Sequence, residues 1–287
     1  MPFRQGILIY NLMEPIIQPE DLLELVKTTD VVIVDAGSSI SYGTQHLKGA
    51  VYADLNLDLA AVPEDAAKGG RHPLPDPAYF GQVLSRLGIT PQSHVVVYDD
   101  KNGALAAARF WWMLRAAGHE KVQVLNGGLT AAVKAGFPLS DLVEMPIPVA
   151  EYTFADWNLP QAYMDEVETA ALGTEHVVID VREAARYRGE TEPIDLIAGH
   201  IPGAINLPYA GNLDENGLFI KPEIIGQKYV DELKGVNAAN SIIHCGSGVT
   251  ACHTILAMNY AGLPMPKLYV GSWSEWSRND KNIASGS

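Results

Sequence analysis

The same series of short motifs occurs twice, in the same order, in the two halves of this 287-residue chain. The matching pairs are residues 31–35 with 177–180, 46–50 with 200–204, and 95–99 with 241–245. The first and third pairs are short apolar segments without alternating polar residues, as is typical of parallel strands buried on both faces. With 47% hydrophobic residues, the chain can form two cores. The repeat therefore predicts two domains of one architecture.

Segments with a helical pattern lie between these strands. They cover residues 19–26, 104–117, 164–171, 228–234 and 251–261. The alternation of strands and helices predicts an α/β fold with two tandem domains, each a mainly parallel sheet flanked by helices. The proline-containing, non-periodic stretch from Pro138 to Pro160 is expected to connect them. We therefore expect a first domain over residues 1–140, a linker over 141–160 and a second domain over 161–287.

The two halves differ where the third strand of the repeat ends. The second half has Cys245 and a glycine-rich turn before a helix, whereas the first half has Asp99 and no cysteine. A side chain at this position faces the N-terminus of a helix, where unpaired backbone N–H groups and the helix dipole stabilise an anion. These surroundings favour the thiolate, so that only the second half can be catalytic. The alternative is a buried structural cysteine.

The run from His244 to Ala251, His-Cys-Gly-Ser-Gly-Val-Thr-Ala, resembles the active-site loop of the rhodanese-type sulfurtransferases, in the version typical of 3-mercaptopyruvate sulfurtransferases. Further motifs that resemble those of this family lie at residues 46–50, 124–128, 199–206 and 270–276. The resemblance implies two rhodanese-like domains, the first non-catalytic and the second carrying the nucleophile Cys245. The loop residues that would hold the migrating sulfur are Gly246, Ser247, Gly248, Val249 and Thr250. Thr250 fits equally well as a helix N-terminal cap.

A sulfur donor such as thiosulfate or 3-mercaptopyruvate is an anion, and arginine can bind an oxyanion through two parallel hydrogen bonds. The resemblance assigns donor binding to Arg186, whereas Arg188 is a weaker candidate or a solvated charge. A second donor-binding arginine, expected between Pro193 and Gly199, is absent. His72 lies where the mercaptopyruvate enzymes carry a histidine that reaches the cleft between the domains, and a surface-loop histidine is the alternative. The aspartate that accompanies this histidine in the subfamily falls at Asn56.

The function implied is transfer of sulfur from 3-mercaptopyruvate or thiosulfate to a thiophilic acceptor, cyanide or a thiol, through a persulfide on Cys245. A thiosulfate-specific rhodanese and a non-enzymatic persulfide carrier or interaction module are the alternatives. A cysteine phosphatase would need an arginine six residues after the cysteine, where this chain has Ala251. We expect no cofactor, and no metal because the His, Cys, Asp and Glu spacings do not form a ligand set.

The charge of the chain restricts its partners. Twenty basic residues against 34 acidic ones give a formal net charge of −14, which opposes binding to nucleic acid and to anionic membrane surfaces. We expect small-molecule partners and, as a further candidate, a thiol redox protein. The chain has no apolar stretch of the roughly 18 residues that span a bilayer and no recognisable secretion signal at its N-terminus. With only Cys245 and Cys252 and no disulfide framework, we expect reduced thiols and a cytoplasmic location.

Overall fold

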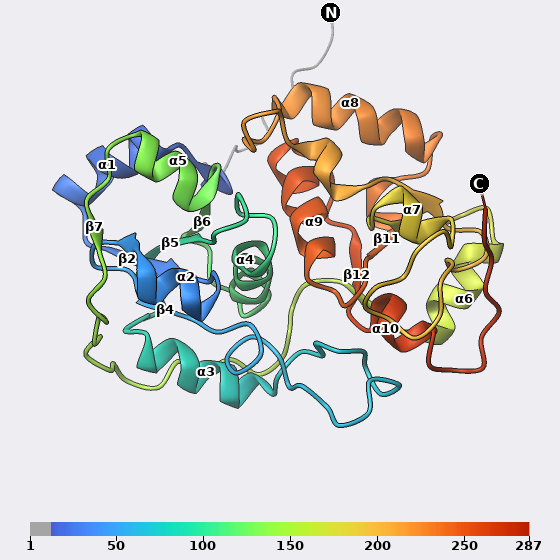
Figure 1. Ribbon diagram of the computed structural model, residues 1–287, viewed down its shortest axis with the longest axis horizontal. Helices are drawn as coiled ribbons and strands as arrows, with labels where there is room; N and C mark the ends of the chain where they lie inside the picture. Colours follow the sequence, from blue (N-terminus) through green and yellow to red (C-terminus); the bar gives the residue numbers. More distant parts are fainter. Residues whose placement is uncertain (1–12, 287) are drawn as a thin grey trace, which may run out of the picture.

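The computed structural model describes residues 13–286, so the N-terminal residues on which the expected absence of a secretion signal depends lie outside the described part. Two five-stranded sheets, one in each half of the chain, lie side by side with helices around and between them (Figure 1). No helix of the described residues is long and apolar enough to cross a membrane.

All strand pairs of the first sheet are parallel, in the order β1-β6-β5-β2-β4. These strands are β1 (Ile16–Ile17), β2 (Val31–Asp35), β4 (Val51–Tyr52), β5 (His94–Tyr98) and β6 (Val122–Leu125). A separate antiparallel pair joins β3 (His46–Leu47) to β7 (Leu139–Ser140). The helices are α1 (Pro19–Thr28), α2 (Ser39–Thr44), α3 (Pro77–Arg86), α4 (Ala106–Ala116) and α5 (Gly128–Lys134).

The second sheet repeats this topology in parallel strands ordered β10-β9-β11-β12-β8. Its strands are β8 (Gln161–Ala162), β9 (Val177–Asp180), β10 (Ile205–Asn206), β11 (Ser241–His244) and β12 (Lys267–Tyr269). Its helices are α6 (Met164–Leu172), α7 (Ala184–Tyr187), α8 (Pro222–Leu233), α9 (Thr250–Tyr260) and α10 (Ser272–Trp276). Short 3-10 turns cover Tyr209–Asn212 and Ala238–Asn240. The predicted fold class, two tandem α/β domains with mainly parallel sheets, is confirmed.

Helix α8 begins six residues earlier than the sequence pattern predicted, at Pro222 instead of Lys228. Pro222 occupies the first helical turn, where the missing N–H of proline has no partner to lose. The helix ends at Leu233, because Lys234 adopts a left-handed conformation with φ of 49°. The other predicted helices agree with the structure to within a few residues at each end.

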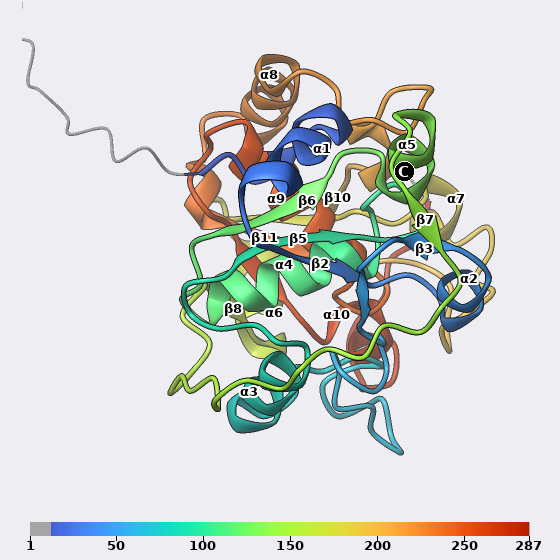
Figure 2. The same ribbon diagram turned by 90° about the vertical axis from the view of Figure 1, so that its left-hand side faces the viewer.

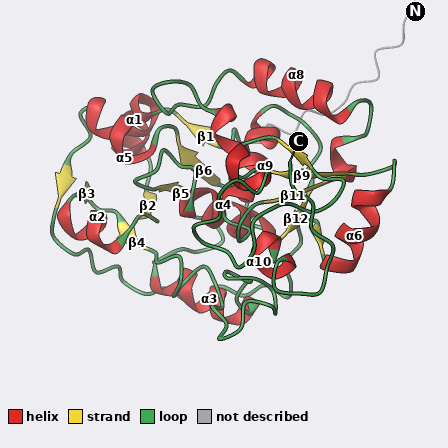
Figure 3. Cartoon of the chain, turned by 45° about the vertical axis from the view of Figure 1, so that its right-hand side comes forward, coloured by secondary structure: helices red, strands yellow, loops and turns green. Residues whose placement is uncertain are grey.

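Both faces of each sheet are covered by helices, as the continuous apolar strands require. Along β5, Val95 and Val97 face α3 and α4, whereas Val96 and Tyr98 face α1 and α5. Figure 2 shows α1 and α5 on one side of this sheet and α3 on the other. In the second half, α8 and α9 cover one face of the sheet, and α6 and α10 cover the opposite face. Figure 3 shows the strands between α9 and α6.

Helices α4 and α9 pack against each other where the two halves meet. Trp111 and Trp112 of α4 belong to the same apolar cluster as Ile255 and Leu256 of α9, and all four side chains are fully buried. A shared core of this kind fixes the two sheets relative to each other because separating them would expose this apolar surface. The end of β11, which carries the candidate nucleophile, lies directly before α9 and thus beside this junction.

The segment from residue 141 to 160 contains no helix or strand. It is nevertheless attached to α3 through Ser85. The carbonyl oxygen of Ser85 accepts a hydrogen bond from Val149 N at 3.0 Å, and the Oγ of Ser85 accepts one from Tyr152 N at 2.9 Å. Trp157 packs on Phe80 of α3 with the ring centroids 5.5 Å apart. The connection between the two halves therefore packs against the first domain.

Candidate active site

Cys245 directly follows β11, and the turn through Val249 leads into α9. Its side chain is 2% exposed, and it contacts the apolar cluster at the junction of the two halves. Helix α9 begins at Thr250, and its N-cap position belongs to Val249 without any side-chain hydrogen bond. The interpretation of Thr250 as the capping residue is therefore wrong. The hydroxyl lies one position too far along the chain to cap the first turn.

The segment that includes α10 holds the turn in place through hydrogen bonds. Trp273 N donates to the carbonyl of Cys245 at 3.0 Å, and Ser274 N donates to the carbonyl of Gly246 at 2.8 Å. The backbone N–H of Cys245 donates to Ser272 Oγ at 3.2 Å. The motif at residues 270–276, which contains Trp273 and Trp276 and is called the tryptophan motif below, thus fixes both peptide planes that flank the thiol. A turn fixed before substrate arrives need not reorganise during the reaction.

Two glycines allow the close approach of chains around this turn. Gly248 has φ of +73°, and a Cβ there would lie 2.5 Å from the carbonyl oxygen of Val270. Gly70, in the first domain, has φ of +80°, and a Cβ there would lie 2.3 Å from the carbonyl oxygen of Gly271. Side chains at either position would clash with backbone, and glycine alone tolerates both the conformation and the contact. Gly70 thereby brings the next residues of the first domain against the turn that follows Cys245.

The equivalent turn of the first domain shows what this backbone geometry binds. Asp99 follows β5 as Cys245 follows β11, and its buried carboxylate accepts four backbone hydrogen bonds from its own turn. The donors are Lys101 N at 2.9 Å, Gly103 N at 2.7 Å, Leu105 N at 3.0 Å and Ala107 N at 3.1 Å. Unpaired N–H groups at the start of a helix suit an anion. In the first domain that position is filled by the protein's own carboxylate; in the second it belongs to a cysteine.

His72 contacts the turn from the first domain, at a position that the sequence left open between the cleft and a surface loop. Its Nδ1 lies 2.8 Å from Ser247 Oγ, and its Nε2 lies 3.1 Å from Asn56 Oδ1. Burial, together with the nearby charges of Arg71 and Arg109, lowers the pKa of His72 to about 4. The imidazole is therefore neutral at neutral pH. With the proton on Nε2 facing the Asn56 carbonyl, Nδ1 accepts the hydroxyl hydrogen of Ser247.

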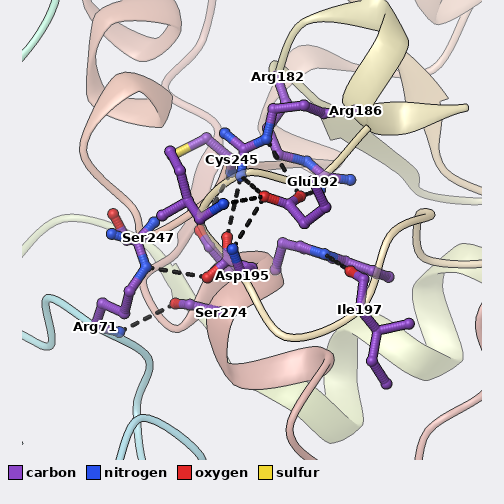
Figure 4. Close-up of polar contacts among 12 residues, drawn as sticks. Arg71, Arg182, Arg186, Glu192, Asp195, Ile197, Cys245, Ser247 and Ser274 are labelled. Atoms are coloured by element: carbon purple, nitrogen blue, oxygen red, sulfur yellow. Dashed lines mark hydrogen bonds and ion pairs between the residues drawn. The ribbon is translucent and has the colours of Figure 1, made fainter. Parts of the chain in front are cut away.

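Arg186 also lies at the site (Figure 4). Its Nη2 donates to Glu192 Oε1 at 2.7 Å and to Asp195 Oδ2 at 3.1 Å. Burial opposes its charge, but these two carboxylates outweigh burial and raise the pKa of Arg186. Arg188, the weaker candidate, does not join this group. It forms an exposed ion pair with Glu190 at 2.6 Å.

Sequence reasoning missed a fully buried arginine beneath the turn. Arg109 of α4 donates from Nη2 to the carbonyl of His72 at 3.0 Å and from Nη1 to the carbonyl of Gly248 at 3.4 Å. It thus connects His72 of the first domain to the turn that follows Cys245. Burial lowers the pKa of Arg109. The signal for it was present, since a single arginine inside the apolar run of α4 needs buried acceptors.

Sequence reasoning also missed the group of arginines around Asp195, whose side chain is fully buried. Oδ1 accepts from Arg71 Nε at 3.0 Å and lies 3.4 Å from Arg278 Nη1, while Oδ2 accepts from Arg186. Arg71 comes from the first domain, and Arg278 follows the tryptophan motif. The sequence distance between these residues left no local signal by which they could have been grouped.

Arg182 has a structural role. It is fully buried and pairs with Asp180 at 2.6 Å and with Glu192 at 3.2 Å. Its guanidinium also lies over the ring of Trp273, 4.6 Å from the centroid. The guanidinium of Arg182 is therefore engaged by groups of the protein itself.

A cavity of about 410 Å³ opens beside the turn on the first-domain side. It is lined by Arg71, His72 and Arg278 together with residues 62–66 of the loop between β4 and α3. Within residues 13–286, no group of three or more His, Cys, Asp or Glu side chains is arranged to hold a metal ion. Residues of both domains line the cavity, and Cys245 is not among them; His72 connects the cavity to the turn through Ser247.

The rhodanese-like domain matches this chain twice, over residues 18–135 and 164–279. This chain belongs to the rhodanese family. A probable 3-mercaptopyruvate sulfurtransferase of Pseudomonas aeruginosa is 38% identical over 93% of this chain and 96% of its own length. A thiosulfate sulfurtransferase of Gallus gallus is 39% identical over 71% of this chain and 70% of its own.

The architecture agrees with solved structures of the family. A 3-mercaptopyruvate sulfurtransferase from Leishmania major is 31% identical and superposes with a TM-score of 0.79, covering 92% of this chain and 74% of that one. The protein is therefore a tandem-domain rhodanese and a sulfurtransferase enzyme. Small-molecule sulfur donors and acceptors follow from this class.

Proposed function

We propose that this rhodanese transfers sulfur from 3-mercaptopyruvate, and also from thiosulfate, to cyanide or a thiol through a persulfide on Cys245. The observation that carries the proposal is the position of Cys245 in a turn whose counterpart in the first domain binds a carboxylate through four backbone N–H groups. The same arrangement around a thiolate or a persulfide would stabilise its negative charge.

In the first half of the reaction, the thiolate of Cys245 attacks the donor's outer sulfur. With thiosulfate, the bond between its two sulfur atoms breaks and sulfite leaves with the electron pair. With 3-mercaptopyruvate, the carbon–sulfur bond breaks, and the enolate of pyruvate leaves and takes up a proton. In the second half, cyanide attacks the outer sulfur of the persulfide, thiocyanate leaves, and the thiolate is restored. Covalent catalysis thus divides the transfer into two displacements.

Ser247 and His72 support 3-mercaptopyruvate as the preferred donor. The neutral imidazole of His72, 2.8 Å from Ser247 Oγ, orients a hydroxyl beside the thiol. A hydroxyl in that position can stabilise the enolate that only the mercaptopyruvate reaction produces. Arg186 binds the donor's anionic group from the other side of the turn. Val249 and Thr250 complete the loop through their backbone, and Arg188 has no part in this proposal.

Mass spectrometry of the intact protein after treatment with 3-mercaptopyruvate tests the proposal. One added sulfur atom should appear and should map to the peptide that contains Cys245. Cys252 provides the matched control, because burial raises the pKa of its thiol to about 12 and keeps it protonated. Cys252→Ser should still acquire the sulfur, whereas Cys245→Ser should not. A fully active protein that never carries sulfur on Cys245 would exclude the mechanism.

The same preparation separates the enzyme from a persulfide carrier. Multiple turnovers of a small donor with cyanide identify an enzyme, whereas a carrier would load once from a protein partner and stop. We further propose that the chain divides into a non-catalytic domain over 1–140, a linker over 141–160 and a catalytic domain over 161–287. A thiol redox protein is a proposed physiological acceptor, and the two free cysteines agree with a proposed cytoplasmic location.

A further inference from the structure

Helices α4 and α9 occupy equivalent places in the two halves and pack against each other (Figure 1). Residues 99–105, called the first-domain turn below, lead from β5 into α4, and residues 245–249, called the second-domain turn, lead from β11 into α9. The fourth residue of α4 is Arg109, and the fourth residue of α9 is His253. Both side chains are fully buried. The repeat thus places a buried side chain with ring or guanidinium nitrogens at the same position of each helix.

Each of these two side chains lies against the turn of the opposite domain. Arg109 donates to the carbonyl of Gly248 in the second-domain turn at 3.4 Å, and His253 lies beside Gly103 of the first-domain turn. The first-domain turn holds a carboxylate that its own backbone N–H groups bind. The side chain that faces it is neutral, because burial lowers the pKa of His253 to about 4. The second-domain turn holds a thiol, and the side chain that faces it is a guanidinium.

Arg109 carries a buried charge without a carboxylate partner. Its remaining hydrogen bonds go to the carbonyls of Leu59 at 3.4 Å and of His72 at 3.0 Å. Its Nε has no partner among the described residues, and no carboxylate of residues 13–286 forms an ion pair with it. Carbonyl dipoles reduce the cost of burying a guanidinium, but they leave its net charge unbalanced.

Two thiols lie where they can interact with this charge. Burial lowers the pKa of Arg109, whereas Cys252 and then Cys245 act in the opposite direction. The Sγ of Cys252 donates to the carbonyl of Gly248 at 3.3 Å, which is the carbonyl that also accepts from Arg109. Burial raises the pKa of Cys252 to about 12, so this thiol stays protonated. Cys245 is the thiol that remains to supply a negative charge.

The other titratable groups around Cys245 are either neutral or paired. Burial lowers the pKa of two imidazoles and raises that of a phenol, which keeps three side chains neutral: His72, His244 and Tyr209. Two guanidiniums pair with carboxylates, those of Arg71 and Arg186 with Asp195 and Glu192. In the described part of the chain, Arg109 is therefore the cation at this turn whose charge no carboxylate balances.

We propose that Arg109 supplies the positive charge that stabilises the thiolate of Cys245 and, after sulfur transfer, its persulfide. Attraction between opposite charges is strong in a site from which water is excluded. Arg109 is fully buried and acts through Cys245 and not on the donor, so it is a positioning residue. This inference rests on the proposed function, because it requires Cys245 to be the nucleophile. The first domain then contributes to the reactivity of the thiol although it carries no cysteine.

The pH dependence of Cys245 alkylation by iodoacetamide measures this contribution without requiring sulfur transfer. The thiolate sulfur forms a bond to the CH₂ carbon of the reagent and iodide leaves, so the rate follows the ionised fraction of the thiol. The reagent is uncharged, and a change in the attraction of anions to the site therefore does not affect the result. Peptide mass spectrometry confirms that the modified residue is Cys245 and not the fully buried Cys252.

Arg109→Gln should move the midpoint of this rate profile upward by about one pH unit, as expected for the loss of a nearby opposite charge. Arg109→Lys loses the planar set of donors but keeps the charge, and its midpoint should return most of the way to that of the wild type. Arg115→Gln is the matched control on the same helix and should leave the profile unchanged. Arg115 lies in the last turn of α4 and donates to backbone carbonyls there.

Two results would overturn the role of Arg109. One is an unchanged midpoint in folded Arg109→Gln. The other is an equal shift in Arg109→Gln and Arg109→Lys, because lost hydrogen bonds and not the lost charge would then be the cause. Failure of the wild type to acquire sulfur would instead contradict the proposed function and would leave the alkylation profiles standing.

A second pair of variants tests the same charge from the turn if Arg109→Gln does not fold. Cys245→Asp places a permanent anion beside Arg109, and Cys245→Asn places a neutral group of the same shape there. Cys245→Asp should melt at the higher temperature at pH 7, and this advantage should disappear as the pH falls below about 4, where the carboxylate becomes protonated. A lower melting temperature for Cys245→Asp than for Cys245→Asn at pH 7 would refute the proposed balance of charges.

Discussion

Replacing Asn56 with aspartate should raise the pKa of His72 without altering the shape of the site. Asn56 Oδ1 lies 3.1 Å from His72 Nε2, so Asn56→Asp puts a carboxylate oxygen where an amide oxygen now accepts the hydrogen bond. In the wild type, burial and two arginines hold the pKa of His72 at about 4 instead of 6.5. Within residues 13–286, no negatively charged side chain contacts the ring to oppose them.

The magnitude follows from these contacts. A fall from 6.5 to about 4 corresponds to roughly 3 kcal/mol against the protonated form. Because the unfolded chain takes up this proton first, the free energy of unfolding falls as the pH drops from 6.5 towards 4, by up to that amount. A carboxylate in direct contact favours imidazolium by about 1–3 pKa units. The pKa of His72 in Asn56→Asp should therefore lie between about 5 and 7, and this acid-induced loss of stability should shrink accordingly.

A histidine side-chain NMR titration measures the shift, and urea unfolding at pH 5 and pH 7.5 measures its effect on stability. The inflection that His72 contributes to the dependence of kcat/KM on pH should move by the same amount. His253 serves as an internal control, because it lies in α9 among apolar neighbours and its pKa of about 4 should not change. If the pKa of His72 were the same in both proteins, Asn56 would not contact the imidazole and the proposed arrangement with Ser247 would be incorrect.

Three further substitutions test other parts of the site and its support. Ser247→Ala should lower kcat with 3-mercaptopyruvate about 100-fold in steady-state assays and should affect thiosulfate less; equal losses would argue against enolate stabilisation. Asp99→Asn replaces one oxygen of the carboxylate that accepts four backbone hydrogen bonds with an NH₂ group. We expect urea unfolding to show that the free energy of unfolding falls by about 2–4 kcal/mol. His253→Phe removes two buried ring nitrogens that have no partner among the described residues and keeps the stacking on Phe219. It should raise the free energy of unfolding by about 1–3 kcal/mol at pH 7. The gain should be larger at pH 5, because burial lowers the pKa of His253, so that the unfolded wild-type chain binds the proton before the folded one does. A smaller gain at pH 5 than at pH 7 would contradict this.

The helices and strands could be predicted from the sequence, and a nucleophile proposed from it, because their signals are local. A buried parallel strand is a continuous apolar run, and a helix shows its period over a few turns. The position of Cys245 between a strand and a helix follows from neighbouring residues alone. The errors concern the ends of two helices. Thr250 lies one residue past the cap position of α9, and α8 begins at Pro222, which the periodicity did not reveal.

The composition of the active site depended on tertiary structure. His72 and Ser247 are 175 positions apart in the chain, and Arg71 and Asp195 are 124 apart. No periodicity or spacing links residues at such distances. The packing of α4 on α9 brings the first-domain loop against the catalytic turn, and only then do the charges find their partners. The sequence by itself thus determined two α/β domains and the cysteine proposed as the nucleophile. The tertiary structure decided which side chains surround that residue, because burial removes water and leaves each charge to be balanced by whatever the fold brings within reach.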